Sequence, residues 1–319
     1  MTEKTRALVV LALLSPLIGE MLSGSSPPLE FFNPFLFALL LGMYGAGALL
    51  IRELVIRWRK GWAATIALGA AYGIIEEGIA VKSFFDPGWQ DLGALAEYGR
   101  YLGVNWVWAV WLTIYHSAIS ICLPILLVAL IFPRLESEPL LGRRGLRVVA
   151  LLFTADIAFC AVLFTYAQDF FPGAGEYLLA FLATAVLVVV AVKVPDEVLS
   201  PSGGTPSWRP WRFALLGFAF VLGSFVVAGA APEGVHPAIM IGILLLLSAA
   251  ALLALARRIG SARNRPHKAY FAVGLMSVFI VLSPVHEVNG MMGMSVVGIV
   301  FAAFSYWLVR RVGREPEVE

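Results

Sequence analysis

The chain has 319 residues, of which 60% are hydrophobic and 14% are charged, and its formal net charge is +2. An ordinary soluble domain is about 45–50% apolar and about 25% charged, so this composition excludes a soluble globular protein and indicates one embedded in the lipid bilayer. The small net charge, with no basic cluster interleaved with aromatic residues, excludes nucleic acid as a partner. Cys122 and Cys160 lie in apolar stretches and no Cys/His spacing resembles a structural zinc site, so we expect no metal and no other cofactor.

Ten apolar stretches are long enough to cross the hydrocarbon core, which takes about 20 residues of α-helix. They are expected near residues 6–23, 34–51, 61–84, 105–132, 147–168, 177–195, 211–231, 237–256, 268–286 and 290–310. The sequence thus predicts an all-α fold, a polytopic bundle of about ten transmembrane helices. We expect a single integral membrane domain over 1–319, with six spans over about 6–195, a connector rich in turn residues over 196–210, and four spans over about 211–310.

Positive charge alternates between the predicted loops, and this alternation predicts the orientation of the chain. Lys and Arg concentrate at both termini and in every second loop, whereas they are absent from residues 24–33, 169–176, 232–236 and 286–289. Both termini are therefore predicted to be cytoplasmic, in a multi-pass protein of the cell (inner) membrane. A cleaved signal peptide over 1–26 is an alternative that would leave nine spans in the same orientation.

The third predicted span contains two adjacent carboxylates, Glu76 and Glu77. An ionised side chain at bilayer depth costs at least about 2.5–3.5 kcal/mol, and such residues usually mark a functional site. Neighbouring residues of an α-helix point about 100° apart, so we expect the two carboxylates to face different surroundings. One of them is predicted to serve a site and the other to pair with Lys82 or Arg100.

Other polar residues collect near the same predicted outer face. His116 lies on a polar stripe of the fourth span, and His286, Glu287 and Asn289 follow one another at the junction of the last two spans. We predict an outward-opening polar pocket, covered by the loop 82–104. The predicted catalytic residues are Glu76, Glu77, His116, His286 and Asn289. The predicted substrate-binding residues are Glu20, Ser23, Lys82, Asn105 and Glu287.

The order of these residues resembles the CPBP (CAAX protease and bacteriocin-processing) family of intramembrane glutamic peptidases, whose motifs are EExxxR, FxxxH and HxxxN. Glu76-Glu77 matches the acidic pair, but Val81 stands at the arginine position and Lys82 follows one place late. Leu112 replaces the phenylalanine before His116, and Asn289 comes one residue early after His286. The resemblance implies hydrolysis of a membrane-bound peptide.

The residues themselves leave several functions open. A carboxylate with a histidine partner can activate water, and an asparagine can stabilise an oxyanion, which indicates a membrane-embedded hydrolase acting on a small molecule or peptide. Buried acids and imidazoles also suit a proton- or cation-coupled carrier, and a non-catalytic scaffold is a third reading. Glu76, His116 and His286 are a further alternative as zinc ligands.

Overall fold

The computed structural model describes residues 1–200, 203–230 and 234–314, and it confirms the all-α fold with ten helices long enough to cross a membrane. Each of the first four spans contains a π-helical segment, and the later six are continuous α-helices over the described residues. Spans one to four are α1 (Glu3–Pro16) with Leu17–Leu22; α3 (Pro34–Leu40), Leu41–Gly45 and α4 (Ala46–Arg57); α5 (Trp62–Ile74) with Ile75–Ala80; and α6 (Trp106–Tyr115), His116–Cys122 and α7 (Leu123–Ile131). Spans five to ten are α8 (Arg143–Gln168), α9 (Ala174–Lys193), α10 (Pro210–Ala230), α11 (Pro237–Arg258), α12 (Arg265–Val288) and α13 (Met294–Arg314).

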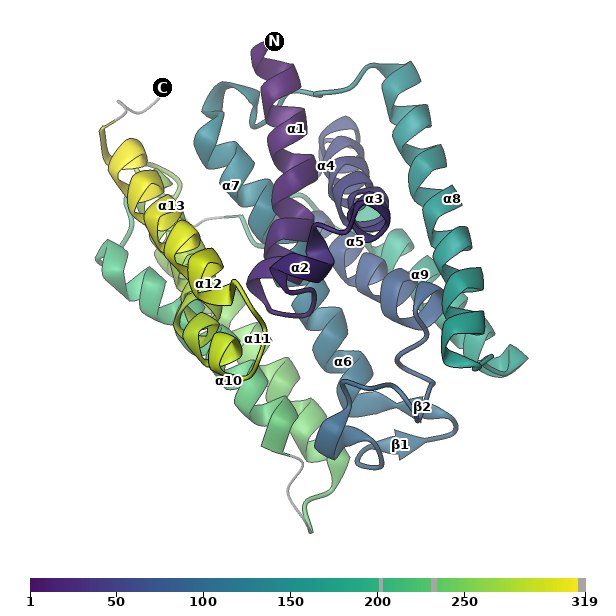
Figure 1. Ribbon diagram of the computed structural model, residues 1–319. Coiled ribbons are helices and arrows are strands. Elements are labelled where there is room, and N and C mark those ends of the chain that lie inside the picture. Colours follow the sequence, from purple (N-terminus) through teal and green to yellow (C-terminus); the bar gives the residue numbers. More distant parts are fainter. Residues whose placement is uncertain (201–202, 231–233, 315–319) are drawn as a thin grey trace.

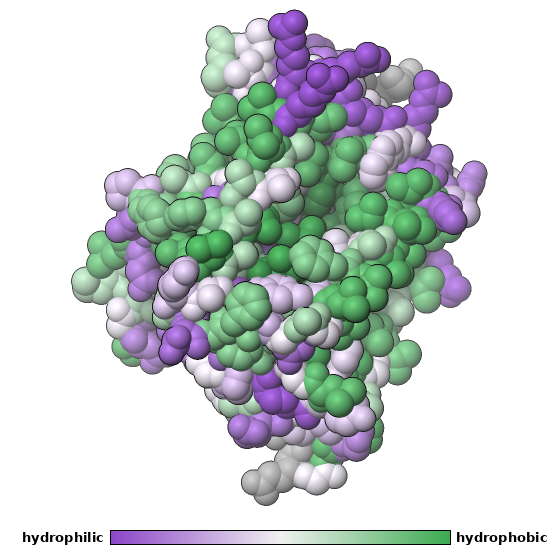
Figure 2. All heavy atoms as spheres, turned by 90° about the vertical axis from the view of Figure 1, so that its right-hand side faces the viewer, coloured by the Kyte–Doolittle hydropathy of each residue, from purple (hydrophilic) through white to green (hydrophobic). Residues whose placement is uncertain are grey.

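The first four spans form the centre of the bundle. In the apolar windows of the third and fourth spans 67% of the residues are buried, against 17% in α8 and 11% in α9. Figure 1 shows α8 at one edge of the molecule and α10–α13 at the other. On the side where α8 lies, hydrophobic residues cover most of the middle and hydrophilic residues crowd the upper end (Figure 2). The outer helices therefore meet lipid, and polar groups inside the first four spans are shielded from it.

The two ends of the bundle differ. α1 begins and α13 ends at one of them, here called the terminal end, as ten spans require (Figure 1). The other, called the hairpin end, contains the small antiparallel ribbon of β1 (Arg100–Tyr101) and β2 (Val104–Asn105) (Figure 1). The short helix α2 (Pro28–Phe31) lies in the connection between the first two spans. The cytoplasmic location of the terminal end stays a prediction from the loop charges.

The loop between the third and fourth spans is fixed to the bundle. Asn105 donates from its side chain to Leu95 O (2.5 Å), and its backbone N–H donates to Phe84 O (2.9 Å). Arg100 donates to Phe85 O (2.8 Å) rather than to Glu76 or Glu77, so the predicted pairing of a glutamate with Arg100 is wrong. These bonds hold the loop in place over the hairpin end.

Candidate functional site

The π-helical segments carry the polar residues of the bundle interior. A π-helical turn inserts an extra residue into an α-helix and is frequent at functional sites. The four segments contain Glu20, Tyr44, the pair Glu76 and Glu77, and His116, one set from each of the first four spans. The same local distortion therefore occurs wherever a central span contributes to the cluster.

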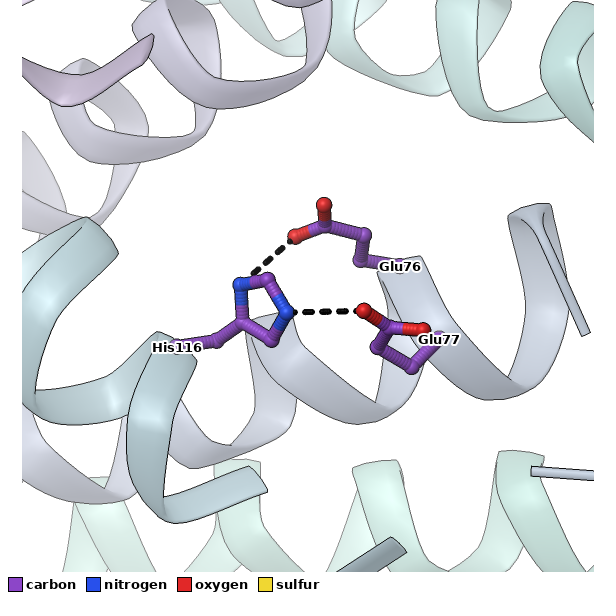
Figure 3. Close-up of side chains that lie close together, drawn as sticks. All are labelled: Glu76, Glu77 and His116. Carbon is purple, nitrogen blue, oxygen red and sulfur yellow. Dashed lines mark hydrogen bonds and ion pairs between the residues drawn. The ribbon is translucent and has the colours of Figure 1, made fainter. Parts of the chain in front are cut away.

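His116 lies between the two glutamates (Figure 3). Its Nδ1 is 3.1 Å from Oε2 of Glu76, and its Nε2 is 2.9 Å from Oε1 of Glu77. All three side chains are buried. The two carboxylates approach opposite nitrogens of one ring, which agrees with their different directions on the helix and brings both to a single site. The sequence prediction that one of them would serve elsewhere is wrong.

Glu77 is held on both of its oxygens. The hydroxyl of Ser83 donates to Glu77 Oε2, and Ser83 in turn accepts from the indole N–H of Trp108 (2.9 Å). With Oε1 engaged by His116, the carboxylate is fixed by the loop and by the fourth span. A carboxylate fixed in this way orients the imidazole.

Glu76 is less completely bonded. Its Oε2 is buried and accepts no hydrogen bond from the described residues, although it lies close to His116. The hydroxyl of Tyr72, one helical turn before it, is likewise buried without a partner among the described residues. Buried polar atoms are normally hydrogen-bonded. Oε2 of Glu76 has only its 3.1 Å contact with His116, and the Tyr72 hydroxyl has no hydrogen bond among the described residues, so both groups need a functional explanation.

Glu20 extends the cluster toward the hairpin end. The hydroxyls of Ser26 (2.7 Å) and Tyr44 donate to its two oxygens. Tyr115 closes another side by donating to Gly19 O (2.8 Å) and packing edge-on against His116, with ring centroids 5.2 Å apart. Three tyrosines, Tyr44, Tyr72 and Tyr115, thus surround the imidazole within about 6 Å.

A cavity of about 670 Å³ connects these groups to the hairpin end. Its charged and imidazole side chains, among the described residues, are five carboxylates and two histidines: Glu20, Glu30, Glu76, Glu77, Asp91, His116 and His286. Ligand pockets of proteins commonly measure about 300–1,000 Å³, so the cavity is large enough for a substrate. A polar cavity lies where the sequence predicts a pocket, and residues 89–92, 94 and 95 of the predicted covering loop form part of its wall. That it opens outward stays a prediction.

Three residues at the centre of the cluster could also hold a metal ion. Glu76, Glu77 and His116 each offer one ligand atom, and these atoms lie within 4.8 Å of one another. Two carboxylates and one imidazole suit a divalent first-row metal. Each ring nitrogen faces a carboxylate, however, which is the arrangement of an ion-paired imidazolium (Figure 3).

Several predicted site residues lie away from this cluster. Lys82 is buried against α8, where its ammonium donates to Ala161 O (2.5 Å) and to the hydroxyl of Thr165 (2.8 Å), and burial lowers the pKa of Lys82. The predicted pairing of Lys82 with a glutamate of the third span is therefore wrong. The side chain of Asn105 donates to Leu95 O in the loop and accepts from the backbone N–H of Trp108 at the start of α6.

The residues predicted at the junction of the last two spans separate. Glu287 accepts from the backbone N–H groups of Gly293 (3.1 Å) and Ser295 (2.9 Å) and so caps α13. Asn289 is exposed after the end of α12. His286 lines the cavity and lies against Gly24, where a Cβ would come within 2.1 Å of Nδ1. Ser23 also lines the cavity, but its hydroxyl donates to the backbone of its own helix.

Tyr44, Tyr72, Ser83 and Trp108 belong to the site but were not predicted. Tyr72 had a sequence signal, because it precedes Glu76 by four residues and therefore shares its helix face. Ser83 and Trp108 had none, since their roles depend on how the loop folds back onto α6.

Ten membrane-length helices around a buried polar cluster define a multi-pass helical membrane protein. A family model described as an uncharacterized membrane protein family matches residues 9–316, so the chain belongs to that family. No curated protein and no solved structure matches the chain. The family match supports a membrane protein, but it does not support the resemblance to the CPBP peptidases.

Proposed function

We propose that this protein is a membrane-embedded hydrolase in which Glu76 activates water. The observation that carries the proposal is the inequality of the two glutamates on either side of His116. Glu77 is hydrogen-bonded on both oxygens, whereas Oε2 of Glu76 has only its 3.1 Å contact with His116 Nδ1 among the described residues, and Glu76 lines a large cavity. The first arrangement suits a positioning residue and the second a general base.

The reaction follows from these positions. Glu76 takes one proton from a water molecule as the water oxygen attacks an acyl carbon, which forms a tetrahedral oxyanion. The buried hydroxyl of Tyr72 supplies a hydrogen-bond donor for that oxyanion, and His116, when protonated, supplies positive charge. When the intermediate collapses, the bond to the leaving group breaks and Glu76 returns the proton to that group, so that an acid and an alcohol or amine leave the site.

The CPBP resemblance adds a peptide to the possible acyl substrates. The structure supports its acidic pair and first histidine, which converge. The structure gives less support to the last motif of the CPBP family, because Asn289 is exposed at the end of α12. The oxyanion donor is therefore proposed to be Tyr72 in place of Asn289.

The test does not require a known substrate. Membranes containing the protein are incubated in ¹⁸O-water, and newly formed carboxylic acids carrying the heavy isotope are identified by mass spectrometry. Hydrolysis places one water oxygen in each new carboxyl group. Glu76→Gln should lower the rate of incorporation by about 10²–10⁴-fold, the usual contribution of a general base. The matched control is Glu138→Gln, an exposed carboxylate at the terminal end whose side chain pairs with Lys4.

The competing functions give different results. A proton- or cation-coupled carrier, which the chain of titratable groups Glu20, Tyr44, His116 and Glu77 would also suit, predicts ion flux in proteoliposomes and no isotope-labelled product. A scaffold predicts neither. A metal-dependent hydrolase predicts that chelation abolishes the labelled product and that added zinc restores it. Unchanged incorporation in Glu76→Gln would overturn the proposed role of this residue.

A further inference from the structure

The cavity has a second wall of different chemistry. Opposite the carboxylates, the lining comes from the second span and from α8 and is almost entirely hydrocarbon. Its members are Leu36, Leu39, Met43, Cys160, Leu163 and Phe164. A water-soluble substrate would gain nothing from contact with this wall. A hydrocarbon surface favours contact with an apolar molecule, so the wall favours an apolar occupant.

One pair of aromatic rings connects the two helices of this wall at the surface of the molecule. Phe35 of α3 and Phe159 of α8 make an edge-to-face contact with centroids 6.3 Å apart. Both side chains are about half exposed, at 56% and 48%. Phe35 also lines the cavity, so the ring pair separates the cavity from the bilayer. Side chains of exposed residues change rotamer within nanoseconds without movement of the backbone.

The space between α3 and α8 behind the Phe35–Phe159 pair, here called the gap, is bounded at both of its ends along the membrane normal. Toward the middle of the membrane, Gly42 allows Asp156 to pack directly against the second span, since a Cβ there would lie 2.7 Å from the Asp156 Cγ. Toward the hairpin end, Trp89 packs on Phe164 with centroids 6.0 Å apart. From Phe35 to Gly42 the helix rises about 10 Å at 1.5 Å per residue. The gap therefore lies within one leaflet, whose hydrocarbon is about 15 Å deep.

We propose that an amphiphile with a long hydrocarbon chain and a neutral or cationic head group enters the cavity from this leaflet, between α3 and α8, by displacing the Phe35–Phe159 contact. Its chain lies along the apolar wall and its head group lies at Glu76, Glu77 and His116. As a statement of the substrate class, the inference rests on the proposed hydrolase function. As a statement of binding, it rests on the cavity alone.

Charge and size select this occupant. Five carboxylates line the cavity against two histidines, so an anionic head group would be repelled. An α-helix with its side chains is about 10–12 Å across, and a cavity of about 670 Å³ would enclose only one or two turns of it. A single hydrocarbon chain fits this volume. It also fits through the gap, which one pair of side chains closes.

The experiment uses the full chain in nanodiscs of zwitterionic phospholipid. The probe is a long-chain primary alkylamine with a diazirine on its chain, and the comparison probe is the fatty acid of equal length. After irradiation, labelled peptides are mapped by mass spectrometry. A second apolar groove of about 320 Å³, lined by Phe220, Leu252 and Leu275 among others, provides the internal control, because no part of it belongs to the gap.

Access is tested by tying the gap shut. Phe35→Cys and Phe159→Cys are combined in a Cys122→Ser, Cys160→Ser background and bridged by a reducible bis-methanethiosulfonate. Bridging should lower labelling of the cavity peptides by about tenfold, one decade of apparent affinity, and reduction should restore it. Labelling of the apolar groove should not change. Recovery on reduction shows that the bridged protein is folded.

The outcomes separate this inference from the proposed function. Cavity labelling that survives bridging would overturn access between α3 and α8. Labelling by the fatty acid equal to that by the amine would overturn the choice of head group, for which we expect about tenfold discrimination. Glu138→Gln, whose exposed carboxylate lies outside the cavity, should label like the unaltered protein. If the amine labels the cavity of the unaltered protein while isotope incorporation is absent, the hydrolase proposal fails and the binding inference stands.

Discussion

Two buried glutamates, one near each end of the bundle, have opposite surroundings. Glu53, close to the terminal end, has no exposed surface and both of its oxygens are paired. Oε1 accepts from Leu140 N (2.7 Å) and lies 3.3 Å from Arg52, and Oε2 lies 3.3 Å from Arg57. Glu76, near the hairpin end, lines a cavity, and its Oε2 lies 3.1 Å from His116 Nδ1 but accepts no hydrogen bond from the described residues.

The completeness of hydrogen bonding distinguishes a structural carboxylate from a functional one within a membrane. Arg52 also donates to Leu135 O (2.5 Å) and Glu138 O (3.1 Å), so the Glu53 cluster fastens the turn between α7 and α8 to the second span. Both oxygens of Glu53 serve the fold in this way, although Nε of Arg57 has no partner among the described residues. A carboxylate that is less completely hydrogen-bonded and lies beside a cavity lowers stability, and this cost is typical of a site that binds or reacts.

The strongest test of this contrast is Glu53→Gln. Removing one partner of a buried ion pair leaves an uncompensated charge on Arg52 and costs about 3–5 kcal/mol. We expect the midpoint of thermal unfolding in detergent to fall sharply, with fluorescence of the purified protein as the readout. Glu76→Gln should change stability by less than about 1 kcal/mol, because His116 keeps its contact with Glu77 and no charge is left without a partner. Equal losses in the two variants would contradict the distinction.

The fold was largely predictable from the sequence, and for a definite reason. A bilayer requires about 20 apolar residues for each helix, and this requirement located all ten spans within several residues of their observed ends, such as 237–256 against α11 at Pro237–Arg258. Packing partners were not predictable. Lys82 and Asn105 were expected in the site because they are polar and near it, but Lys82 donates to α8 and Asn105 donates to the backbone of its own loop.

The site was predictable only where charge is rare. Glu76, Glu77 and His116 were identified because ionisable residues within spans are uncommon, and they do converge. Helical periodicity failed for the rest, because π-helical segments change the direction of side chains within four spans. Tyr44 lies in such a segment, inside an apolar and glycine-rich stretch that gives no sign of a polar partner.

A smaller effect is expected at Lys82, which fastens the loop at the hairpin end as Arg52 fastens the turn at the other. Lys82→Met keeps the apolar stem and removes the two hydrogen bonds of the ammonium to α8, at a cost of about 1.5–3 kcal/mol for bonds from a charged group. Hydrogen exchange over residues 82–105 should accelerate. Lys193→Met, on an exposed lysine at the end of α9, should leave that exchange unchanged. Exchange that stays slow in Lys82→Met would show that the loop is held by its other bonds.

The smallest change in stability, with the opposite sign, is expected at Tyr72. Its hydroxyl is buried without a partner among the described residues, so Tyr72→Phe should leave stability unchanged or raise it by up to about 1 kcal/mol. Tyr115→Phe is the matched variant: it removes a hydroxyl bonded to Gly19 O and should lower stability by about 1 kcal/mol. Thermal unfolding of the two variants gives the comparison. If Tyr72 donates to the oxyanion, its variant should also lose about 10²–10³-fold in isotope incorporation. A stable Tyr72→Phe protein that keeps full incorporation would remove the hydroxyl from the reaction, and an unstable one would show that the hydroxyl is bonded in the folded protein.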